Sequence, residues 1–217
     1  MKTKIRILIA DDHEIVRRGI RPLIELEWGW EICGEAVDGR QAVAMALELK
    51  PDIVIVDVSM PELSGVEVTR QIKRDLPETE VLIFTGQDSE ALVHQLFAAG
   101  ARGFVMKSEA AQHLIPAIKA LCEHQPFFGS RVTGIVFDQY LKGGASPAQA
   151  APDGLTPRER EIVQLLAEGK SNKEVAVVLG ISIKTAETHR ATVMRKLGFE
   201  SFSELVRYAI RNHIVPP

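Results

Sequence analysis

The stretch "DIVIVDVSMPELSG", residues 52–65, joins a buried strand to a charged end. Residues 53–56 are four consecutive Ile and Val side chains, a pattern typical of a strand that is buried on both faces of a parallel sheet. The run stops at Asp57, and Pro61 and Gly65 follow within eight residues. In open parallel sheets, ligands bind at the carboxyl ends of the strands. Asp57 is therefore the first candidate for a functional group.

Similar apolar runs alternate with amphipathic segments on both sides of this stretch. The other runs are residues 5–10, 31–36, 81–84 and 103–106. The amphipathic segments are residues 14–27, 39–49, 66–75, 90–99 and 109–123. Five strands that alternate with five helices predict an open, doubly wound parallel α/β sheet over residues 1–125. Right-handed crossovers place the carboxyl ends of all five strands at one edge of this sheet.

The rest of the chain has a different sequence pattern, without apolar runs that alternate with helices. Residues 126–153 predict a linker that contains a short helix near residues 132–141 and ends in Gly, Ala, Ser and Pro. Residues 154–217 predict a small all-α domain with capping-box starts. Its four helices are expected near residues 157–168, 172–179, 183–197 and 202–212. A tight turn with Gly180 joins the middle two, as in a helix-turn-helix.

Composition is that of a globular protein with one or two domains. Of 217 residues, 46% are hydrophobic and 25% charged. The net charge of −3 divides into −5 for residues 1–150 and +2 for the remainder. No uncharged run approaches the roughly 20 residues of a membrane span, and the apolar stretch at residues 7–10 is too short for a signal peptide. Cys33 and Cys122 lack the spacing of a metal site. We expect a cytoplasmic protein without a membrane partner.

Further functional side chains follow the other strands. Asp11 and Asp12 end the first strand, which should neighbour the third, so three carboxylates meet at one edge. Such a cluster raises the carboxyl pKa values or binds a cation, and carboxylates with retained water suit Mg²⁺. Thr85 and Lys107 end the fourth and fifth strands at the same edge. A carboxylate nucleophile, a hydroxyl, an ammonium and a metal site are the groups that phosphoryl transfer needs.

These residues resemble a known family. Asp11 and Asp12, Asp57 with Met-Pro three residues on, Thr85, and "GFVMK" ending on Lys107 resemble the flavodoxin-like receiver domain of bacterial response regulators. The stretch "LTPREREIVQLLAEGKSNKEVAVVLGISIKTAETHRATVMRKLG" resembles the LuxR-type helix-turn-helix. In this order, the pair is similar to the NarL/FixJ class of two-component transcription factors.

The resemblance implies a role for each group at the sheet edge. Asp57 would accept a phosphoryl group from a sensor histidine kinase, Lys107 would pair with it, and Thr85 would close onto it. Phe104 would be the aromatic switch that turns inward as Thr85 moves. The Mg²⁺ ligands would be Asp11, Asp12, Asp57 and the backbone carbonyl of Ser59. No enzymatic activity is expected beyond Mg²⁺-dependent self-phosphorylation and self-dephosphorylation of Asp57.

The helix at residues 183–197 is the expected DNA-reading element. It carries a net charge of +3 and has polar side chains along one stripe. A basic helix at this place suits the major groove. The side chains expected to pack inward are Ile183, Ala186, Val193 and Leu197. The resemblance implies DNA-facing positions at Lys184, Glu187, Thr188 and Ala191, and we expect phosphate contacts from Lys173 and Arg195. The partners would be promoter DNA and, on phosphorylation, a second copy of the chain.

Single residues decide between the functional interpretation above and its alternatives. A phosphatase of the haloacid dehalogenase type needs a second Asp two residues after the nucleophile, and that position is Ser59. His13 adjoins the acidic pair, and we interpret it as a helix-start residue and not as a ligand. Arg190 and Lys196 could be DNA contacts or solvated charges. A second function stays open: a constitutive DNA-binding regulator whose receiver is a phosphate-independent dimerisation platform.

Overall fold

The computed structural model describes residues 4–130, 132–135, 155–212 and 214–215. The chain forms two compact units. The first unit contains a parallel sheet of six strands in the order β2-β1-β3-β4-β5-β6. The strands are β1 (Ile5–Ala10), β2 (Trp30–Ala36), β3 (Ile53–Val56), β4 (Glu80–Thr85), β5 (Gly103–Met106) and β6 (Phe127–Phe128). The doubly wound parallel sheet expected from the sequence is confirmed.

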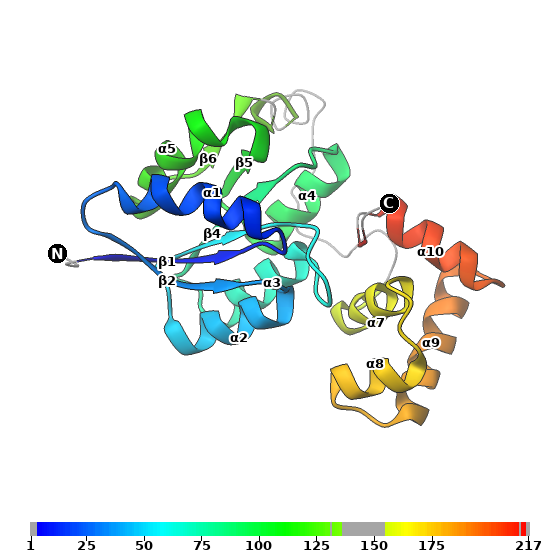
Figure 1. The fold of residues 1–217 in the computed structure, drawn as a ribbon. Coiled ribbons are helices and arrows are strands. Elements are labelled where there is room, and N and C mark those ends of the chain that lie inside the picture. The colour runs from blue at the N-terminus through cyan, green and yellow to red at the C-terminus, as the bar shows by residue number, and fades with distance from the viewer. Residues whose placement is uncertain (1–3, 131, 136–154, 213, 216–217) are drawn as a thin grey trace. The chain divides into compact units, whose positions relative to one another are not determined.

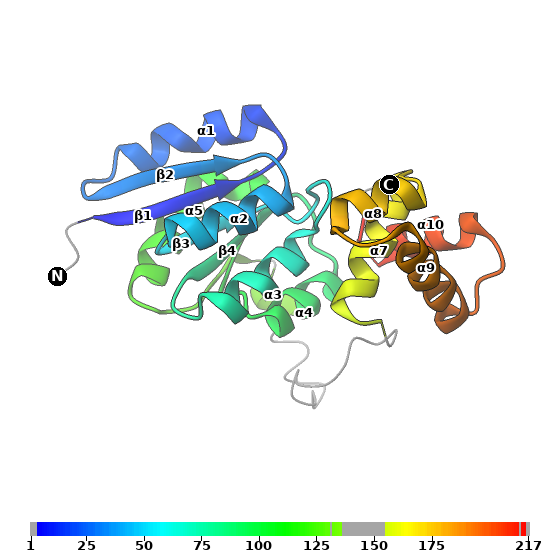
Figure 2. The ribbon, with the colours of Figure 1, turned by 90° about the horizontal axis from the view of Figure 1, so that it is seen from below.

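Helices cover both faces of this sheet. They are α1 (Glu14–Glu25), α2 (Gly39–Leu49), α3 (Gly65–Asp75), α4 (Glu90–Ala99) and α5 (Ala110–Cys122), and a 3₁₀ turn, Lys107–Glu109, precedes α5. Figures 1 and 2 show α1 and α5 on one face and α2, α3 and α4 on the other. The face under α1 and α5 is a continuous apolar core, because alternate residues of the strands meet Ile20 and Ile24 of α1 and Leu114 and Ile118 of α5.

The sixth strand corrects the five-stranded expectation. Phe127 and Phe128 pair in parallel with Gly103 and Phe104 of β5. The Phe128 ring packs edge-on against Phe97 of α4, with ring centroids 4.9 Å apart. This piece of the expected linker is therefore part of the sheet, because the outer edge of β5 offers backbone groups with which an extended segment can pair.

The second unit is all helical. Its helices are α7 (Pro157–Ala167), α8 (Asn172–Leu179), α9 (Ile183–Leu197) and α10 (Phe202–Arg211). The hydroxyls of Thr156 and Ser171 accept the amide protons of Glu159 and Glu174, which confirms the predicted starts of α7 and α8. Gly180 ends α8 in the left-handed conformation at φ +63° and opens the turn into α9.

The core of the second unit gathers one face of each helix. Ala186 and Val193 of α9 are buried in it as expected, and Leu197 packs against it while partly exposed. Ile183 was expected to pack inward, but its side chain is 48% exposed, because it is the first residue of α9 and precedes the turn that meets the core. A short helix was expected near residues 132–141. Residues 132–135 are helical, and residues 136–154 lie outside the described part of the chain.

None of the helices in the described part of the chain has the length and hydrophobicity that a bilayer crossing requires.

Candidate functional site

Two buried carboxylates lie side by side at the carboxyl edge of the sheet. Asp11 follows β1 and Asp57 follows β3, and these strands are hydrogen-bonded neighbours with Ala10 opposite Val56. The Asp57 amide donates to the Ala10 carbonyl oxygen at 2.8 Å, so the register continues past the strand ends. The two residues are only 2% and 3% exposed. Burying two like charges together is unfavourable unless a cation compensates them.

Lys107 supplies a positive charge between them. It follows β5, and its Nζ lies 2.8 Å from Asp11 Oδ2 and 3.0 Å from Asp57 Oδ2. Burial alone would lower the pKa of Lys107, but the hydrogen bond to Asp11 and the charge of Asp57 outweigh it and raise that pKa above its ordinary value. Lys107 therefore carries its charge at neutral pH and neutralises one of the two carboxylates.

Polar groups of the loops after β3 and β4 surround the cluster of Asp11, Asp57 and Lys107. Thr85 ends β4 and is 1% exposed, and its Oγ1 accepts the Gln87 amide proton at 3.2 Å. The Gln87 side chain donates from Nε2 to Ser59 Oγ at 2.9 Å. This bond links the loop after β4 to the loop after β3, and it holds Ser59, two residues beyond Asp57, next to the site. The peptide bond between Lys107 and Ser108 is trans.

Gly65 lets α3 begin directly under the Asp57 backbone. A Cβ atom at Gly65 would lie 2.3 Å from the Asp57 carbonyl oxygen and 2.8 Å from Val58 Cα. The Gly65 amide instead donates to the Val58 carbonyl oxygen at 2.9 Å. The Gly eight residues after Asp57 is therefore a packing requirement of the loop that presents the carboxylate.

The start of α1 adds two groups that bear on the same carboxylates. His13 caps α1, and its backbone amide donates to Asp11 Oδ1 at 2.9 Å. The imidazole Nδ1 lies 2.8 Å from Asp12 Oδ1 and 3.3 Å from Asp11 Oδ1. One turn later, buried Arg17 donates to the Asp11 carbonyl oxygen at 2.7 Å and to Glu35 at 3.0 Å. Arg17 thus fixes the backbone from which Asp11 projects.

The donors at this edge fit a divalent cation. One ligand atom each from Asp11, Asp12, His13 and Asp57 can be chosen so that all four lie within 4.8 Å of one another. We call these four residues the acidic edge. Hard divalent cations prefer oxygen ligands, and three of the four groups are carboxylates. The Lys107 ammonium between two of them indicates that the edge already attracts positive charge.

Comparison with known proteins gives the family. Residues 7–119 match the response regulator receiver domain, and residues 153–209 match the luxR family of bacterial regulatory proteins.

The chain is a response regulator.

Curated relatives support this over nearly the whole length. The response regulator is 37% identical over 212 residues to the transcriptional regulatory protein LiaR of Bacillus subtilis, covering 97% of this chain and 99% of that protein. It is 33% identical over 215 residues to the oxygen regulatory protein NreC of Staphylococcus aureus, covering 97% of this chain and 99% of that protein. A receiver followed by a LuxR-type DNA-binding domain is therefore the arrangement of the full chain.

Solved structures agree with this assignment. A structure of the RcsB response regulator of Salmonella typhimurium has a TM-score of 0.59 and 29% identity, covering 95% of this chain and 98% of that one. RcsB from Salmonella enterica serovar Typhimurium, bound to promoter rprA in the presence of the phosphomimetic BeF₃⁻, has a TM-score of 0.60 and 29% identity, covering 94% of this chain and 98% of that one. Both likenesses extend through the two domains of the response regulator.

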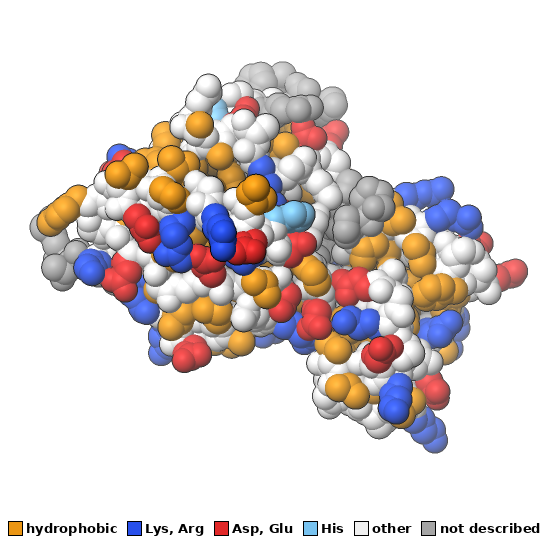
Figure 3. All heavy atoms as spheres, viewed as in Figure 1, with side chains coloured by type: hydrophobic (Ala, Val, Ile, Leu, Met, Phe, Trp, Pro, Cys, Tyr) orange, Lys and Arg blue, Asp and Glu red, His pale blue; other side chains and the backbone are white. Residues whose placement is uncertain are grey.

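The DNA-binding domain of the response regulator presents the expected side chains to solvent. The exposed residues among the predicted contacts are Lys173, Lys184, Glu187, Thr188, Ala191 and Arg195. Thr188 donates its hydroxyl proton to the Lys184 carbonyl oxygen at 2.8 Å. Figure 3 shows Lys and Arg side chains on the surface of these helices, interspersed with acidic ones. The six predicted positions are thus accessible to a ligand.

Arg190 and Lys196, which the sequence left as either DNA contacts or solvated charges, make different contacts in the structure. Lys196 Nζ lies 2.8 Å from Glu159 Oε2, and the Glu159 side chain is 7% exposed. Burial opposes ionisation of Glu159, but Lys196 and Thr156 hold the pKa of that carboxyl below its usual range. Arg190 lies over the ring of Phe202, 5.5 Å from its centroid. Lys196 therefore has a structural ion pair, and Arg190 packs on α10.

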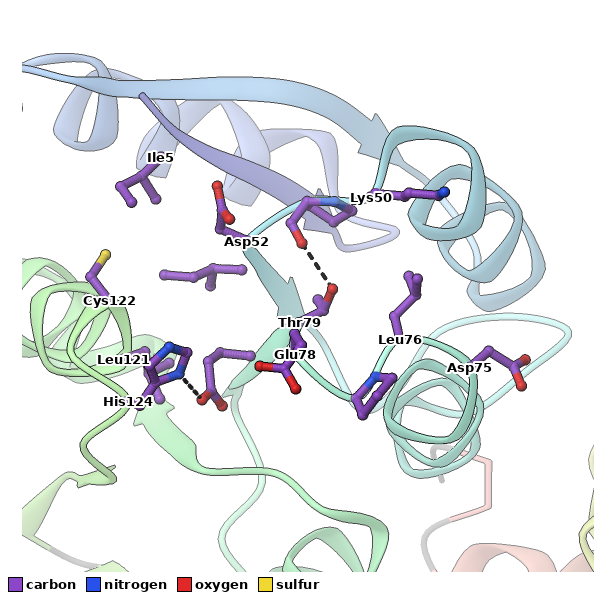
Figure 4. A pocket seen from close by; sticks show the side chains of 14 residues that line it. Ile5, Lys50, Asp52, Asp75, Leu76, Glu78, Thr79, Leu121, Cys122 and His124 are labelled. Atoms are coloured by element: carbon purple, nitrogen blue, oxygen red, sulfur yellow. Dashed lines mark hydrogen bonds and ion pairs between the residues drawn. The ribbon is translucent and has the colours of Figure 1, made fainter. Parts of the chain in front are cut away.

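A hollow of the receiver lies among residues at the amino ends of the strands, shown in Figure 4. Glu80 at the start of β4 is nearly fully buried there, and His124 Nδ1 lies 2.9 Å from its Oε1. Thr79 donates to the Pro51 carbonyl oxygen at 2.9 Å. These contacts tie the loops at the foot of the sheet together, and they involve none of the residues of the acidic edge.

Sequence reasoning placed the main groups of the site and missed their supports. Asp11, Asp57, Thr85 and Lys107 lie together at one edge of the sheet. Their supports are Arg17 and Gln87. Neither has a sequence signal, because each acts through a contact with a residue far away in the chain.

Proposed function

We propose that Asp57 accepts a phosphoryl group from a sensor histidine kinase and that this step controls binding of promoter DNA. The observation that supports it most directly is the Lys107 ammonium, which bridges the two buried carboxylates Asp11 and Asp57 at the end of the sheet. The same site would permit Mg²⁺-dependent self-phosphorylation from small acyl phosphates and self-dephosphorylation.

In the phosphoryl transfer, the protein contributes the attacking carboxylate and mainly positions and stabilises the transferred group. An Asp57 oxygen attacks the phosphorus of the phosphohistidine, the P–N bond breaks with its electron pair returning to the imidazole, and an acyl phosphate forms. Lys107 then pairs with a phosphoryl oxygen, and the Thr85 hydroxyl donates to another. Asp11, Asp12, Asp57 and the Ser59 backbone carbonyl would hold Mg²⁺, and the bound ion would supply positive charge to offset that of the transferring group.

The switch would pass through the strand next to Thr85. Phosphorylation adds about 1.5 to 2 negative charges and three acceptor oxygens. Movement of Thr85 toward them frees space that the Phe104 ring fills, and the neighbouring surface changes. In the described structure Phe104 is 1% exposed, so its ring already lies inside. The proposed response is then a shift of an inward ring and not an inward swing from solvent.

The output would be DNA binding by α8 and α9. Lys184, Glu187, Thr188 and Ala191 are the proposed base-facing positions, and Lys173 and Arg195 the proposed phosphate contacts. One module of this size has a small footprint, so a homodimer on two half-sites is the proposed active form.

Incubation of the full chain with acetyl phosphate and Mg²⁺ tests the phosphoacceptor. We expect one phosphoryl group on the wild type and none on Asp57→Asn, measured by intact mass. Asp75→Asn is the matched control, because Asp75 is exposed at the end of α3 and pairs with Arg74. Equal labelling of wild type and Asp57→Asn would contradict the proposal.

DNA binding by the same variants separates the two candidate functions. If phosphorylation controls binding, acetyl phosphate raises the affinity of the wild type and leaves Asp57→Asn unchanged. A salt-dependent affinity that is the same for both proteins with and without acetyl phosphate would instead favour the constitutive regulator with a phosphate-independent dimerisation platform.

A further inference from the structure

His13 occupies the N-cap position of α1, but its side chain takes no part in the capping. N-cap residues usually accept an amide proton of the first turn with their side chain. The side chain of His13 makes no such bond, and the backbone at this position is held by Asp11 Oδ1. The imidazole is 60% exposed and turns toward the carboxylates of the acidic edge.

The ion pairs of the imidazole with Asp11 and Asp12 have distances that also suit neighbouring ligands on one ion. With bonds of about 2.1 Å, adjacent corners of an octahedron lie about 3 Å apart. His13 Nδ1 lies 2.8 Å from Asp12 Oδ1 and 3.3 Å from Asp11 Oδ1. The ligand set of the acidic edge, which also includes Asp57, spans no more than 4.8 Å.

We propose that His13 Nδ1 is a metal ligand and that it shifts the preference of the acidic edge from Mg²⁺ toward first-row transition ions. This rests on the proposed function, in which the edge binds a divalent cation. Mg²⁺ takes oxygen ligands and keeps its water, whereas imidazole suits Fe²⁺, Co²⁺, Ni²⁺ and Zn²⁺. A nitrogen at this place therefore strengthens binding of the transition ions and adds little for Mg²⁺.

His124 provides a matched control at the opposite end of the sheet. Its imidazole is 63% exposed, and its Nδ1 lies 2.9 Å from the Glu80 carboxylate. Figure 4 draws this ion pair as a dashed line from His124. The spacing is close to that of His13 and Asp12. It has a single carboxylate partner in its ion pair and lies outside the acidic edge. A general effect of removing a surface His–carboxylate pair would appear in His124→Ala as well as in His13→Ala.

The experiment compares ion binding by the wild type, His13→Ala, His13→Gln and His124→Ala, all as full chains. Calorimetric titration with Co²⁺ and with Mg²⁺ gives the selectivity. Both His13 variants should bind Co²⁺ at least about tenfold more weakly, a loss of the size that metal-site substitutions cause. Their Mg²⁺ affinity should stay within about twofold of the wild type, and His124→Ala should match the wild type for both ions.

Electron spin echo spectroscopy with bound Mn²⁺ reports the nitrogen directly. We expect nitrogen modulation in the wild type and in His124→Ala, and its loss in both His13 variants. Mn²⁺ bound without nitrogen modulation in the wild type would overturn the assignment of His13 and leave the acidic edge as a metal site. Failure of the wild type to bind Mn²⁺ or Mg²⁺ at all would overturn the metal site of the proposed function itself.

Discussion

Phe104 of β5 and Phe128 of β6 are register partners on neighbouring parallel strands. The Gly129 amide donates to the Phe104 carbonyl oxygen at 3.1 Å, and the Phe128 ring packs against Phe97 of α4. The proposed switch residue is thus bonded to the segment that leads out of the receiver. A change at Phe104 can therefore reach the segment after the receiver through the hydrogen bond between β5 and Gly129.

Phe128→Ala tests how much this sixth strand stabilises the receiver. Phe128 is half-buried, so we expect a loss of about 2 kcal/mol in the free energy of unfolding, less than the 3 to 5 kcal/mol of a fully buried Phe. Urea unfolding followed by fluorescence measures it, because both tryptophans, Trp28 and Trp30, belong to the receiver. Leu26→Ala, at a side chain 82% exposed, should stay within about 0.5 kcal/mol.

Gly65→Ala tests the close approach of α3 to the loop of Asp57. The added Cβ would lie 2.3 Å from the Asp57 carbonyl oxygen. Because this atom belongs to the backbone, relieving the clash would require the main chain to move. We expect a loss of about 2 kcal/mol or more, together with slower labelling of Asp57. Gly19→Ala is the control, because Gly19 lies inside α1 with nothing within 4 Å of its added Cβ, and it should gain about 0.5 to 1 kcal/mol. Equal effects of the two substitutions would refute the packing argument.

Glu35 makes receiver stability depend on pH on the acid side. Burial opposes ionisation of Glu35, but hydrogen bonds from Arg21 and Arg17 outweigh it and lower the pKa of Glu35 below its ordinary value. A carboxyl with a lowered folded-state pKa stabilises the fold above its unfolded pKa, and this contribution disappears as the pH falls through the folded value.

The destabilisation caused by Glu35→Gln should therefore be largest near neutral pH and shrink as the pH falls below about 4.5, the ordinary value for Glu. Urea unfolding across this range measures it. Glu31→Gln is the control, because Glu31 pairs with Lys4 at an exposed position and should cost little at any pH. A destabilisation by Glu35→Gln that stays constant with pH would contradict the assignment.

Arg195 and Lys196 are adjacent cations of α9 with different expected roles. Arg195→Ala should weaken DNA binding and reduce the slope of log affinity against log salt by about 1, because one phosphate contact is lost. Lys196→Ala should leave that slope unchanged and lower the melting temperature, because the buried Glu159 carboxylate loses the cation of its ion pair. A salt titration and a thermal melt of both variants measure these effects. A reduced salt slope for Lys196→Ala and a lowered melting temperature for Arg195→Ala would contradict these assignments.

Local signals predicted most of the fold. The capping residues Thr156 and Ser171 predicted the starts of α7 and α8, because a cap depends on residues three apart in the chain. The run of Ile and Val at residues 53–56 predicted β3 to the residue, because a strand buried on both faces has no polar position. The convergence of Asp11 and Asp57 followed from topology alone, since adjacent parallel strands end at one edge.

What the sequence could not predict depends on tertiary contacts. Phe127–Phe128 is too short for a periodic pattern, and it pairs only because β5 leaves an edge free. The direction of the His13 imidazole depends on how α1 leaves β1, and Arg17 carries no motif. Ile183 satisfies the helical period, but its position at the first residue of α9 leaves it outside the core.

The short length of β6 also limits how copies of the protein can meet. A long, flat outer strand invites another chain to extend the sheet, and proteins avoid this with very short edge strands and proline. β6 has two residues, with Pro126 before it and Gly129 after it. Its outer side offers too few backbone groups for a second sheet to grow from it. This border of the receiver is thereby protected against strand-mediated aggregation, so any extension of the sheet by a second copy would have to occur at the opposite edge, along β2.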